Sequence, residues 1–233
     1  MNEGRLAVIT ARGGSKRIPR KNIKDFCGKP IIAYSIEVAL GSGLFDEVMV
    51  STDDEEIAAV ARSCGANVPF MRSAAASDDY STTADVLLEV LDEYGKRGST
   101  FETLCCIYPT APFITASELR EAYELMAARK APGVAAVASY DFPPQRGFLV
   151  SETGTIEWAF PEYAQVRSQD LPVMVHDCGR FYFCNTHDFR AHGSMIVPGC
   201  LGFAIDASRV QDIDTVEDWE QAEFKFRYYG ECR

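Results

Sequence analysis

The sequence has no long apolar run. Nothing in its 233 residues approaches the roughly 18 to 20 consecutive apolar residues of a membrane-spanning helix, and the apolar stretch after Arg5 is too short for the core of a secretory signal. Histidine is scarce, and none of the three shows a metal-binding spacing. The eight cysteines form no Cys-x-x-Cys pair, and several lie in apolar runs, where cysteine behaves as a small core residue. We therefore expect a cytoplasmic protein with no membrane partner and no cysteine-bound metal.

An excess of positive charge is also missing. The formal net charge is −11, which argues against a nucleic-acid or anionic-membrane partner, because such surfaces need many lysines and arginines. The P-loop pattern and the dinucleotide pattern Gly-x-Gly-x-x-Gly are absent as well. Apolar residues make up 47% of the chain, and its length suits one domain that spans residues 1–233. Composition thus predicts a single globular domain whose ligand has to be sought in local motifs.

Strand and helix patterns alternate along most of the chain. Apolar runs such as RLAVIT (5–10) and TLCCIY (103–108) predict strands buried on both faces, and capped segments between them predict helices. The predicted strands are 5–10, 47–51, 66–71, 103–108, 133–140, 180–185 and 200–206, and the predicted helices are 30–43, 52–65, 81–98, 115–130 and 215–229. This order predicts an α/β fold with a doubly wound, mostly parallel sheet, in which ligands bind beyond the carboxyl ends of the strands.

The pattern changes at residues 142–172, where prolines, aromatics and turn residues predominate. Within this stretch, SETGT (151–155) predicts the turn of a hairpin. We interpret the stretch as an arm or insertion. Its aromatic residues suit either an oligomer contact or a lid over a substrate, and composition fits both.

Positive charge is gathered directly after the first predicted strand, in TARGGSKRIPRKN (10–22). Its basic residues are Arg12, Lys16, Arg17, Arg20 and Lys21, and no acidic residue interrupts them. The adjacent Gly13 and Gly14 would let backbone N–H groups approach an anion closely. Arg12 can donate to two phosphate oxygens at once, and Lys21 supplies a mobile charge. A solvated basic turn is the alternative, but the position at a strand end of an acidic chain favours a polyphosphate site.

TARGGSKRIPRKN resembles the opening loop of the cytidylyltransferases that activate acidic sugars with CTP, the family of the sialic-acid synthetases. KRIPRKN, CCIYPTAP, FPPQR, RSQDLP and VQDIDTVEDW are most similar to the branch that uses pseudaminic acid, and the likeness covers nearly the whole chain. The resemblance implies a nucleotide-diphospho-sugar transferase fold, Mg2+ as cofactor, and transfer of CMP from CTP to an acidic sugar with release of pyrophosphate. It also implies a homodimer whose arm, here 142–172, reaches the neighbouring active site.

Other functions stay open at this point. The same reaction could act on N-acetylneuraminic, legionaminic or 3-deoxy-manno-octulosonic acid. A non-catalytic nucleotide-binding regulator could keep the basic loop, whereas a nicotinamide dehydrogenase is disfavoured by the missing glycine pattern.

The resemblance also implies which residues bind the nucleotide. The set is Ala11, Arg12, Gly13, Gly14, Ser15, Lys21, Asn22, Arg72, Ser81 and Thr82. Within it, Arg12 and Lys21 would contact the triphosphate and take part in catalysis, and Asn22 would help to fix the loop. Arg72 would border the cytosine pocket, where Ser81 or Thr82 would supply a hydroxyl.

VQDIDT places Asp212 and Asp214 two residues apart. On an extended segment their carboxylates emerge on one face, and Ile213 turns the other way. Two adjacent carboxylates repel unless a cation joins them, and oxygen ligands suit Mg2+. Capping of the last helix is the alternative, but Thr215 and Asp218 already form a capping-box pattern. The resemblance favours the metal, and it implies that Asp212 and Asp214 are catalytic, metal-binding residues.

Four residues are candidates for contacts with the sugar: Tyr108, Arg146, Arg167 and His176. Tyr108 opens YPTAP at a strand end, where sialic-acid relatives commonly have glutamine. The two arginines could pair with a sugar carboxylate, and a surface role is the alternative for each. His176 belongs to a His-Asp-x-Gly segment similar to the pseudaminic branch, in which Arg180 stands where a neutral polar residue is expected.

The other acidic clusters indicate structure. Residues 53–56 predict the capped, negatively charged start of a helix. Asp78 and Asp79 predict the start of another helix, beside the expected base pocket.

Overall fold

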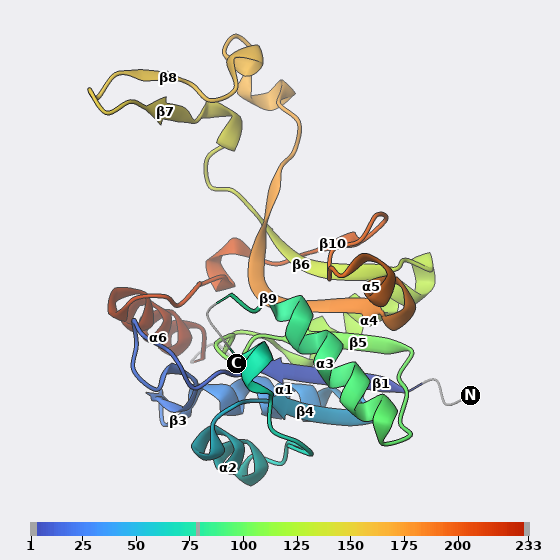
Figure 1. Ribbon diagram of the computed structural model, residues 1–233. Coiled ribbons are helices and arrows are strands. Elements are labelled where there is room, and N and C mark those ends of the chain that lie inside the picture. The colour runs from blue at the N-terminus through green and yellow to red at the C-terminus, as the bar shows by residue number, and fades with distance from the viewer. Residues whose placement is uncertain (1–3, 78–79, 231–233) are drawn as a thin grey trace.

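The computed structural model describes residues 4–77 and 80–230, so the predicted helix start at Asp78 and Asp79 lies outside the described residues. Its centre is a six-stranded sheet with the order β10-β6-β9-β5-β1-β4 (Figure 1). The strands are β1 (Arg5–Thr10), β4 (Glu47–Ser51), β5 (Thr103–Ile107), β6 (Gly133–Ser139), β9 (Val175–Asn185) and β10 (Leu201–Ala204). The helices are α1 (Ile31–Ser42), α2 (Glu55–Ser63), α3 (Thr83–Lys96), α4 (Ala116–Arg129), α5 (Thr186–His192) and α6 (Val216–Gly230). In the described part of the chain, no helix has both the length and the apolar character needed to cross a bilayer.

The sheet is mostly parallel, as predicted. β1 pairs in parallel with β4 and β5, and β10 pairs in parallel with β6, whereas β9 runs antiparallel to both β5 and β6. The strand predicted at 66–71 is wrong, because only an isolated bridge between Met49 and Asn67 forms there. Pro69 explains the difference, since proline has no N–H to donate to a strand ladder.

Both faces of the sheet are covered by helices. On β1, Ala7 and Ile9 face a core shared with α1, α2 and α4, whereas Leu6 and Val8 face a core shared with α3 and α5. All four side chains are fully buried. This two-sided burial is why RLAVIT is apolar at consecutive positions. Because the helices cover the faces of the sheet, the ends of β1 and β5 are the parts that can border a site.

A third apolar cluster joins the two ends of the chain. Its buried members are Ile18, Phe26, Ile31, Phe113, Ile213, Trp219 and Ala222. Phe26 lies in β2 (Asp25–Phe26), which pairs with β3 (Lys29–Pro30), and its ring meets Trp219 edge-on at 5.4 Å. Burial of such side chains contributes about 1.5–3 kcal/mol each. The cluster therefore packs the segment before α6 against the loop that follows β1.

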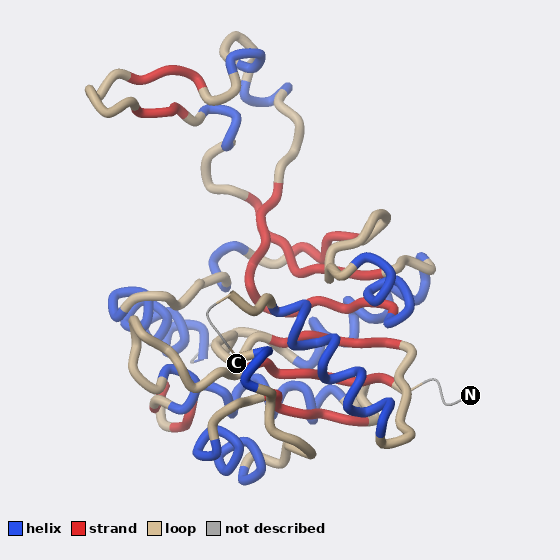
Figure 2. The backbone as a smooth tube through the Cα atoms, viewed as in Figure 1, coloured by secondary structure: helices blue, strands red, loops and turns tan. Residues whose placement is uncertain are grey.

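A hairpin extends away from the sheet between β6 and β9. It consists of β7 (Phe148–Val150) and β8 (Ile156–Trp158), with the predicted turn at 151–155 between them. Figure 2 shows its two connections leaving the sheet close together, where Ser139 of β6 pairs with Val175 of β9, and then separating. The apolar side chains of both short strands are exposed, which leaves the arm with an uncovered apolar surface.

Candidate functional site

A cavity of about 570 Å3 opens beyond the carboxyl ends of β1 and β5. Because these two strands are parallel neighbours, the segments that leave them arrive at the same edge of the sheet. The lining residues are Thr10, Arg12, Ser15, Lys16, Arg17, Lys21, Asn22, Arg72, Ser81, Thr82, Thr83, Val86, Tyr108, Pro109, Thr110 and Asp214. Five of these are basic and one is acidic, so the described lining carries a strong positive excess.

The basic loop is held in place from inside. Asn22 is buried, and its Nδ2 donates to the carbonyl oxygen of Arg12 at 2.9 Å. The hydroxyl of Ser15 donates to the carbonyl oxygen of Ile18 at 2.6 Å. These bonds shape the loop so that Arg12, Lys16, Arg17 and Lys21 border the cavity.

Arg20 is the basic residue of the loop that does not line the cavity. Its backbone is left-handed, with φ of 57°, and its guanidinium pairs with Asp54 at 2.6 Å and also with Glu56. Asp54 is the N-cap of α2 and accepts from two backbone N–H groups there. The pair with Arg20 lowers the pKa of the Asp54 carboxyl. Arg20 thus ties the loop to α2, which sequence spacing did not indicate.

Gly13 contacts the residues that begin α2 and is not among the lining residues. Its N–H donates to the Asp53 carboxylate at 2.8 Å, so that N–H faces the protein rather than the cavity. A Cβ on Gly13 would lie 2.8 Å from Oδ2 and 2.9 Å from Cβ of Asp54. Glycine is needed there because α2 packs directly against the loop. The predicted helix start at 53–56 is confirmed for Asp54, which caps α2, and for Glu55 and Glu56 in its first turn, whereas the Asp53 side chain accepts from the loop.

Two other members of the expected nucleotide set also lie outside the lining. Ala11 is fully buried, and its N–H donates to the carbonyl oxygen of Ser51 at 2.9 Å. Gly14 is exposed, with open space around the position of a Cβ. Of the glycine pair, Gly14 therefore keeps room for an anion to approach its backbone.

Arg72, Ser81 and Thr82 all line the cavity. Arg72 is buried and donates through Nε to the Ser51 hydroxyl at 3.1 Å and through a terminal nitrogen to the Ser51 carbonyl at 2.6 Å. Burial lowers its pKa. Thr82 caps α3 in a capping box with Asp85, so the positive end of this helix dipole also meets the cavity.

The acidic segment near the carboxyl end reaches the basic loop. Oδ1 of Asp214 lies 2.9 Å from Arg17 and 3.7 Å from Nζ of Lys21, and Lys21 also donates to the carbonyl oxygen of Ile213 at 2.7 Å. Ile213 is 1% exposed, so it turns inward as predicted. The structure thus brings together groups that lie 192 residues apart in the chain.

Asp212 and Asp214 differ in their surroundings. Asp214 lines the cavity, whereas Asp212 is exposed and is not among the lining residues. The predicted capping box is confirmed, because the Thr215 N–H donates to the Asp218 carboxylate at 2.8 Å and the Asp218 N–H donates to the Thr215 hydroxyl at 3.2 Å. Within the described residues no group of three or more His, Cys, Asp and Glu side chains could hold a metal. Mg2+ needs fewer protein ligands when phosphates supply the others, so a carboxylate at Asp214 has the chemistry to fit it.

Tyr108 lies in the cavity wall, at the end of β5. Its ring contacts that of Tyr182 at 5.7 Å between centroids, and burial raises the pKa of the Tyr108 phenol. The Tyr182 hydroxyl donates to the Asp177 carboxylate, with O–O distances of 2.5 and 2.6 Å. The bonds to Asp177 thus hold the Tyr182 ring against Tyr108. No pattern in the sequence had predicted this contact between the two tyrosines.

The other three candidates for sugar contacts lie away from this cavity. Arg146 ends η3 (Pro144–Arg146), and its guanidinium donates to carbonyl oxygens of Tyr163, Ala164 and Val166, where it holds the arm together. Arg167 pairs with Asp170 at 2.8 Å on the arm surface. His176 packs on Tyr140 at 4.9 Å and lines a separate cavity. Within one chain, the structure does not bring these three to Tyr108.

Several lining residues were not among the predicted site residues. Arg17 belongs to the basic run, but its direction toward Asp214 depends on the packing of distant segments. Thr83, Val86, Pro109 and Thr110 are ordinary residues of a helix start and a strand end, and their types carry no signal for a site.

Comparisons with known proteins identify the family and the fold of the chain. A sequence model of the family described as cytidylyltransferase matches residues 6–154. The chain is 40% identical, over 95% of its length and 96% of the relative, to a pseudaminic acid cytidylyltransferase of Campylobacter jejuni. It is also 40% identical, over 52% of each chain, to the CMP-N,N'-diacetyllegionaminic acid synthase of Legionella pneumophila. The fold is similar to that of a CMP:2-keto-3-deoxy-manno-octonic acid synthetase solved with CTP, with a TM-score of 0.71, 18% identity, and coverage of 97% and 99% of the two chains.

Proposed function

Because the chain belongs to the cytidylyltransferase family, we propose that it transfers CMP from CTP to pseudaminic acid and releases pyrophosphate. The observation that carries the choice of sugar is the 40% identity, over 95% of the chain, with a pseudaminic acid cytidylyltransferase. The positive excess of the cavity supports the choice of a triphosphate, since cations placed around an anion lower its energy without later rearrangement.

In this proposal the basic loop holds the leaving group. Arg12 and Lys21 neutralise charge on the phosphates that depart as pyrophosphate, while Gly14 and Ser15 border them through the loop backbone. Asn22 keeps the loop in shape through its bond to the Arg12 carbonyl. The cytosine lies toward Arg72, Ser81 and Thr82, which all line the cavity.

The reaction is an in-line displacement at the α-phosphorus of CTP. The anomeric oxygen of the sugar forms a bond to that phosphorus as the bond to the oxygen bridging to the β-phosphate breaks, and the proton of the sugar hydroxyl passes to water. Such a reaction depends chiefly on positioning and on neutralising charge. The fixed cations of the loop serve both needs.

Mg2+ is part of the proposal, with Asp212 and Asp214 as its protein ligands. When bound, the ion neutralises phosphate charge and helps to align the reacting oxygens. Asp214 pairs with Arg17 and Lys21 in the structure, so entry of the triphosphate would exchange these ion pairs. Both carboxylates belong to one short segment beside the cavity, and both are oxygen ligands of the type that Mg2+ prefers.

We propose that the arm joins two copies of the chain. The exposed apolar side chains of β7 and β8 favour such a contact. In a dimer, Arg146, Arg167 and His176 would serve the neighbouring cavity, although they lie away from their own. Sedimentation velocity on the full chain and on a variant lacking 142–172 tests this proposal. A dimer is expected for the full chain, and a monomer for both proteins would refute the proposal.

A cytoplasmic location also belongs to the proposal. The seven cysteines among the described residues are all free thiols. Disulfides are rare in the cytosol, so this state is the one expected there.

The test of the function is pyrophosphate release with CTP and each of four sugars: pseudaminic, N-acetylneuraminic, N,N'-diacetyllegionaminic and 3-deoxy-manno-octulosonic acid. We expect the highest kcat/KM with pseudaminic acid, and a CMP-sugar product identified by mass spectrometry. A higher kcat/KM with another sugar would overturn the choice of substrate. Binding of CTP with no pyrophosphate release from any sugar would favour a nucleotide-binding regulator.

A further inference from the structure

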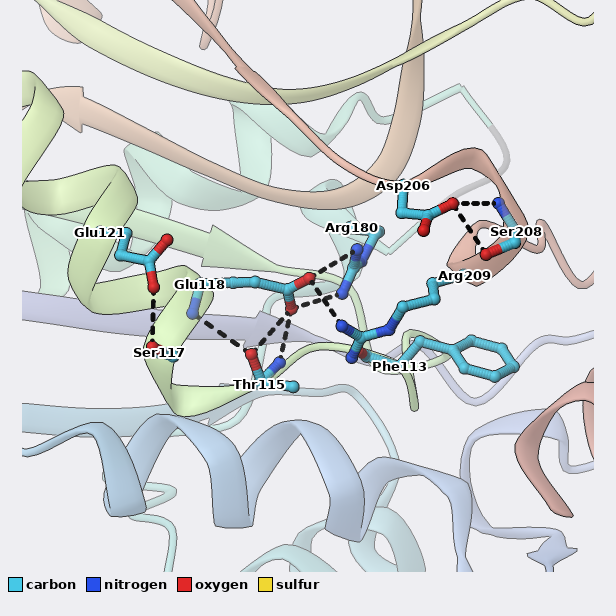
Figure 3. A network of polar contacts seen from close by, with 9 residues as sticks. All are labelled: Phe113, Thr115, Ser117, Glu118, Glu121, Arg180, Asp206, Ser208 and Arg209. Atoms are coloured by element: carbon cyan, nitrogen blue, oxygen red, sulfur yellow. Dashed lines mark hydrogen bonds and ion pairs between the residues drawn. The ribbon is translucent and has the colours of Figure 1, made fainter. Parts of the chain in front are cut away.

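A charge cluster formed by Glu118, Arg180 and Arg209 lies outside the residues that line the cavity (Figure 3). Its centre is Glu118, near the start of α4. The Glu118 carboxylate meets Arg180 of β9 at 2.8 and 3.4 Å, and Arg209 approaches the same carboxylate at 3.7 Å. The side chains of Arg180 and Glu118 are only 4% and 14% exposed, so water screens this pair little.

The Glu118 carboxylate contacts Arg180, Arg209 and Thr115. Besides the two guanidinium groups, Glu118 accepts from the N–H and hydroxyl of Thr115 at 2.7 and 3.1 Å in a capping box. The Nε of Arg180 is buried and has no hydrogen-bond partner among the described residues. Glu118 is the carboxylate that pairs with this buried guanidinium, and burial lowers the Arg180 pKa. Such a cluster costs desolvation energy, so stability alone is a weak reason to keep it.

The cluster connects the segments that carry the site. Arg209 ends η6 (Ala207–Arg209), five residues before Asp214, and donates to the carbonyl oxygen of Phe113 at 3.2 Å. Phe113 ends the segment that begins at Tyr108 and packs in the same apolar cluster as Ile213. The carbonyl oxygen of Arg180 in turn accepts from the Tyr108 N–H at 2.9 Å. Three backbone segments around the cavity thus meet at Glu118.

We propose that Glu118 and Arg209 are positioning residues that set where the acidic segment 206–214 lies relative to the cavity. Arg209 ties that segment to α4 through the Glu118 carboxylate and to the strand-end segment through the Phe113 carbonyl. The placement of Asp214 against Arg17 and Lys21 then depends on Arg209, although Arg209 is not among the residues that line the cavity. This inference rests on the proposed function, since it concerns the carboxylates assigned there to Mg2+.

The test compares Arg209→Met with Arg190→Met. Arg209 is partly exposed, so its replacement leaves the core intact. Arg190 makes a surface pair with Asp92 at 2.7 Å, away from the cluster, and serves as the matched control. We expect Arg209→Met to raise the Mg2+ concentration for half-maximal pyrophosphate release about tenfold, the scale on which groups behind a metal ligand act. Arg190→Met should leave it unchanged, and Arg209→Lys should recover part of the loss.

Hydrogen–deuterium exchange gives a second readout that does not depend on turnover. Peptides covering 206–214 should exchange faster in Arg209→Met than in the wild type or in Arg190→Met. Unchanged exchange together with an unchanged Mg2+ requirement would overturn the proposal. If the wild-type protein releases no pyrophosphate with any sugar, the proposed function fails, whereas the exchange comparison still decides whether Arg209 positions the segment.

Discussion

Replacing Gly13 by alanine should destabilise the protein, whereas the same change at Gly14 should not. A Cβ on Gly13 would lie 2.8–2.9 Å from atoms of Asp54, and nothing lies within 4 Å of a Cβ on Gly14. Neither glycine has a positive φ, so alanine suits the backbone at both positions. The pair therefore isolates the steric contact with α2 from every other property of the loop.

The size of the effect follows from how firmly Asp54 is held. Its Oδ1 caps α2 through the N–H groups of Glu56 and Ile57 at 2.9 and 3.0 Å, and its Oδ2 pairs with Arg20 at 2.6 Å. Overpacking costs about 1–3 kcal/mol, and loss of a cap costs about 1 kcal/mol. The lower entropy of alanine in the unfolded chain returns about 0.4–1 kcal/mol. We expect Gly13→Ala to lose about 1–2 kcal/mol, and Gly14→Ala to be neutral or slightly stabilised.

Calorimetry measures this directly. In a chain of this length each kcal/mol shifts Tm by about 2–4 °C, so Gly13→Ala should melt about 2–8 °C below the wild type and at least as far below Gly14→Ala. The KM for CTP should also rise more in Gly13→Ala, because the basic loop moves with Asp54. Equal Tm values for the two variants would refute the steric explanation and return Gly13 to a direct role at the phosphates.

Three further predictions concern charged groups. Arg180→Met should lower the free energy of unfolding, measured with a denaturant, by about 3–5 kcal/mol, because it breaks a buried ion pair. Arg190→Met should lower it by less than about 1 kcal/mol. Similar losses in the two variants would show that the Glu118 cluster is not shielded from water. Asp214→Asn should lower kcat by on the order of 100-fold at saturating CTP, and wild-type turnover would remove this residue from the metal proposal. Hydrogen bonds from the Thr215 N–H and hydroxyl lower the pKa of Asp218, so its contribution to stability is present above about pH 4 and is lost as the pH falls through the lowered pKa. Urea unfolding at pH 6 and pH 3 should therefore show a smaller pH dependence in Asp218→Asn.

Much of the fold could be predicted because its signals are local. The apolar run at β5 has all its side chains buried, and the capping boxes at α4 and α6 appear as Thr115 with Glu118 and Thr215 with Asp218. Each of these depends on residues three or four positions apart or on one strand. The strand predicted at 66–71 failed for a local reason that was also visible, the proline at position 69.

The predictions about the chemistry of the site came from residue types. A basic run after the first strand and two aspartates near the end pointed to an anion and to a cation, because each type of charge has few ligands that suit it. Motifs of this kind can be recognised without knowing which residues lie close together in the folded chain.

The direction of each charged side chain and the partner that it contacts depended on packing between segments far apart in the chain. Folding turned Arg20 toward α2 and Arg17 toward Asp214, although the two are neighbours in one basic run. It also placed two arginines on the single carboxylate of Glu118. Hydrogen bonds and ion pairs act over a few ångströms, so which charges meet is decided only when the sheet, its helices and the carboxyl-terminal segment have packed together.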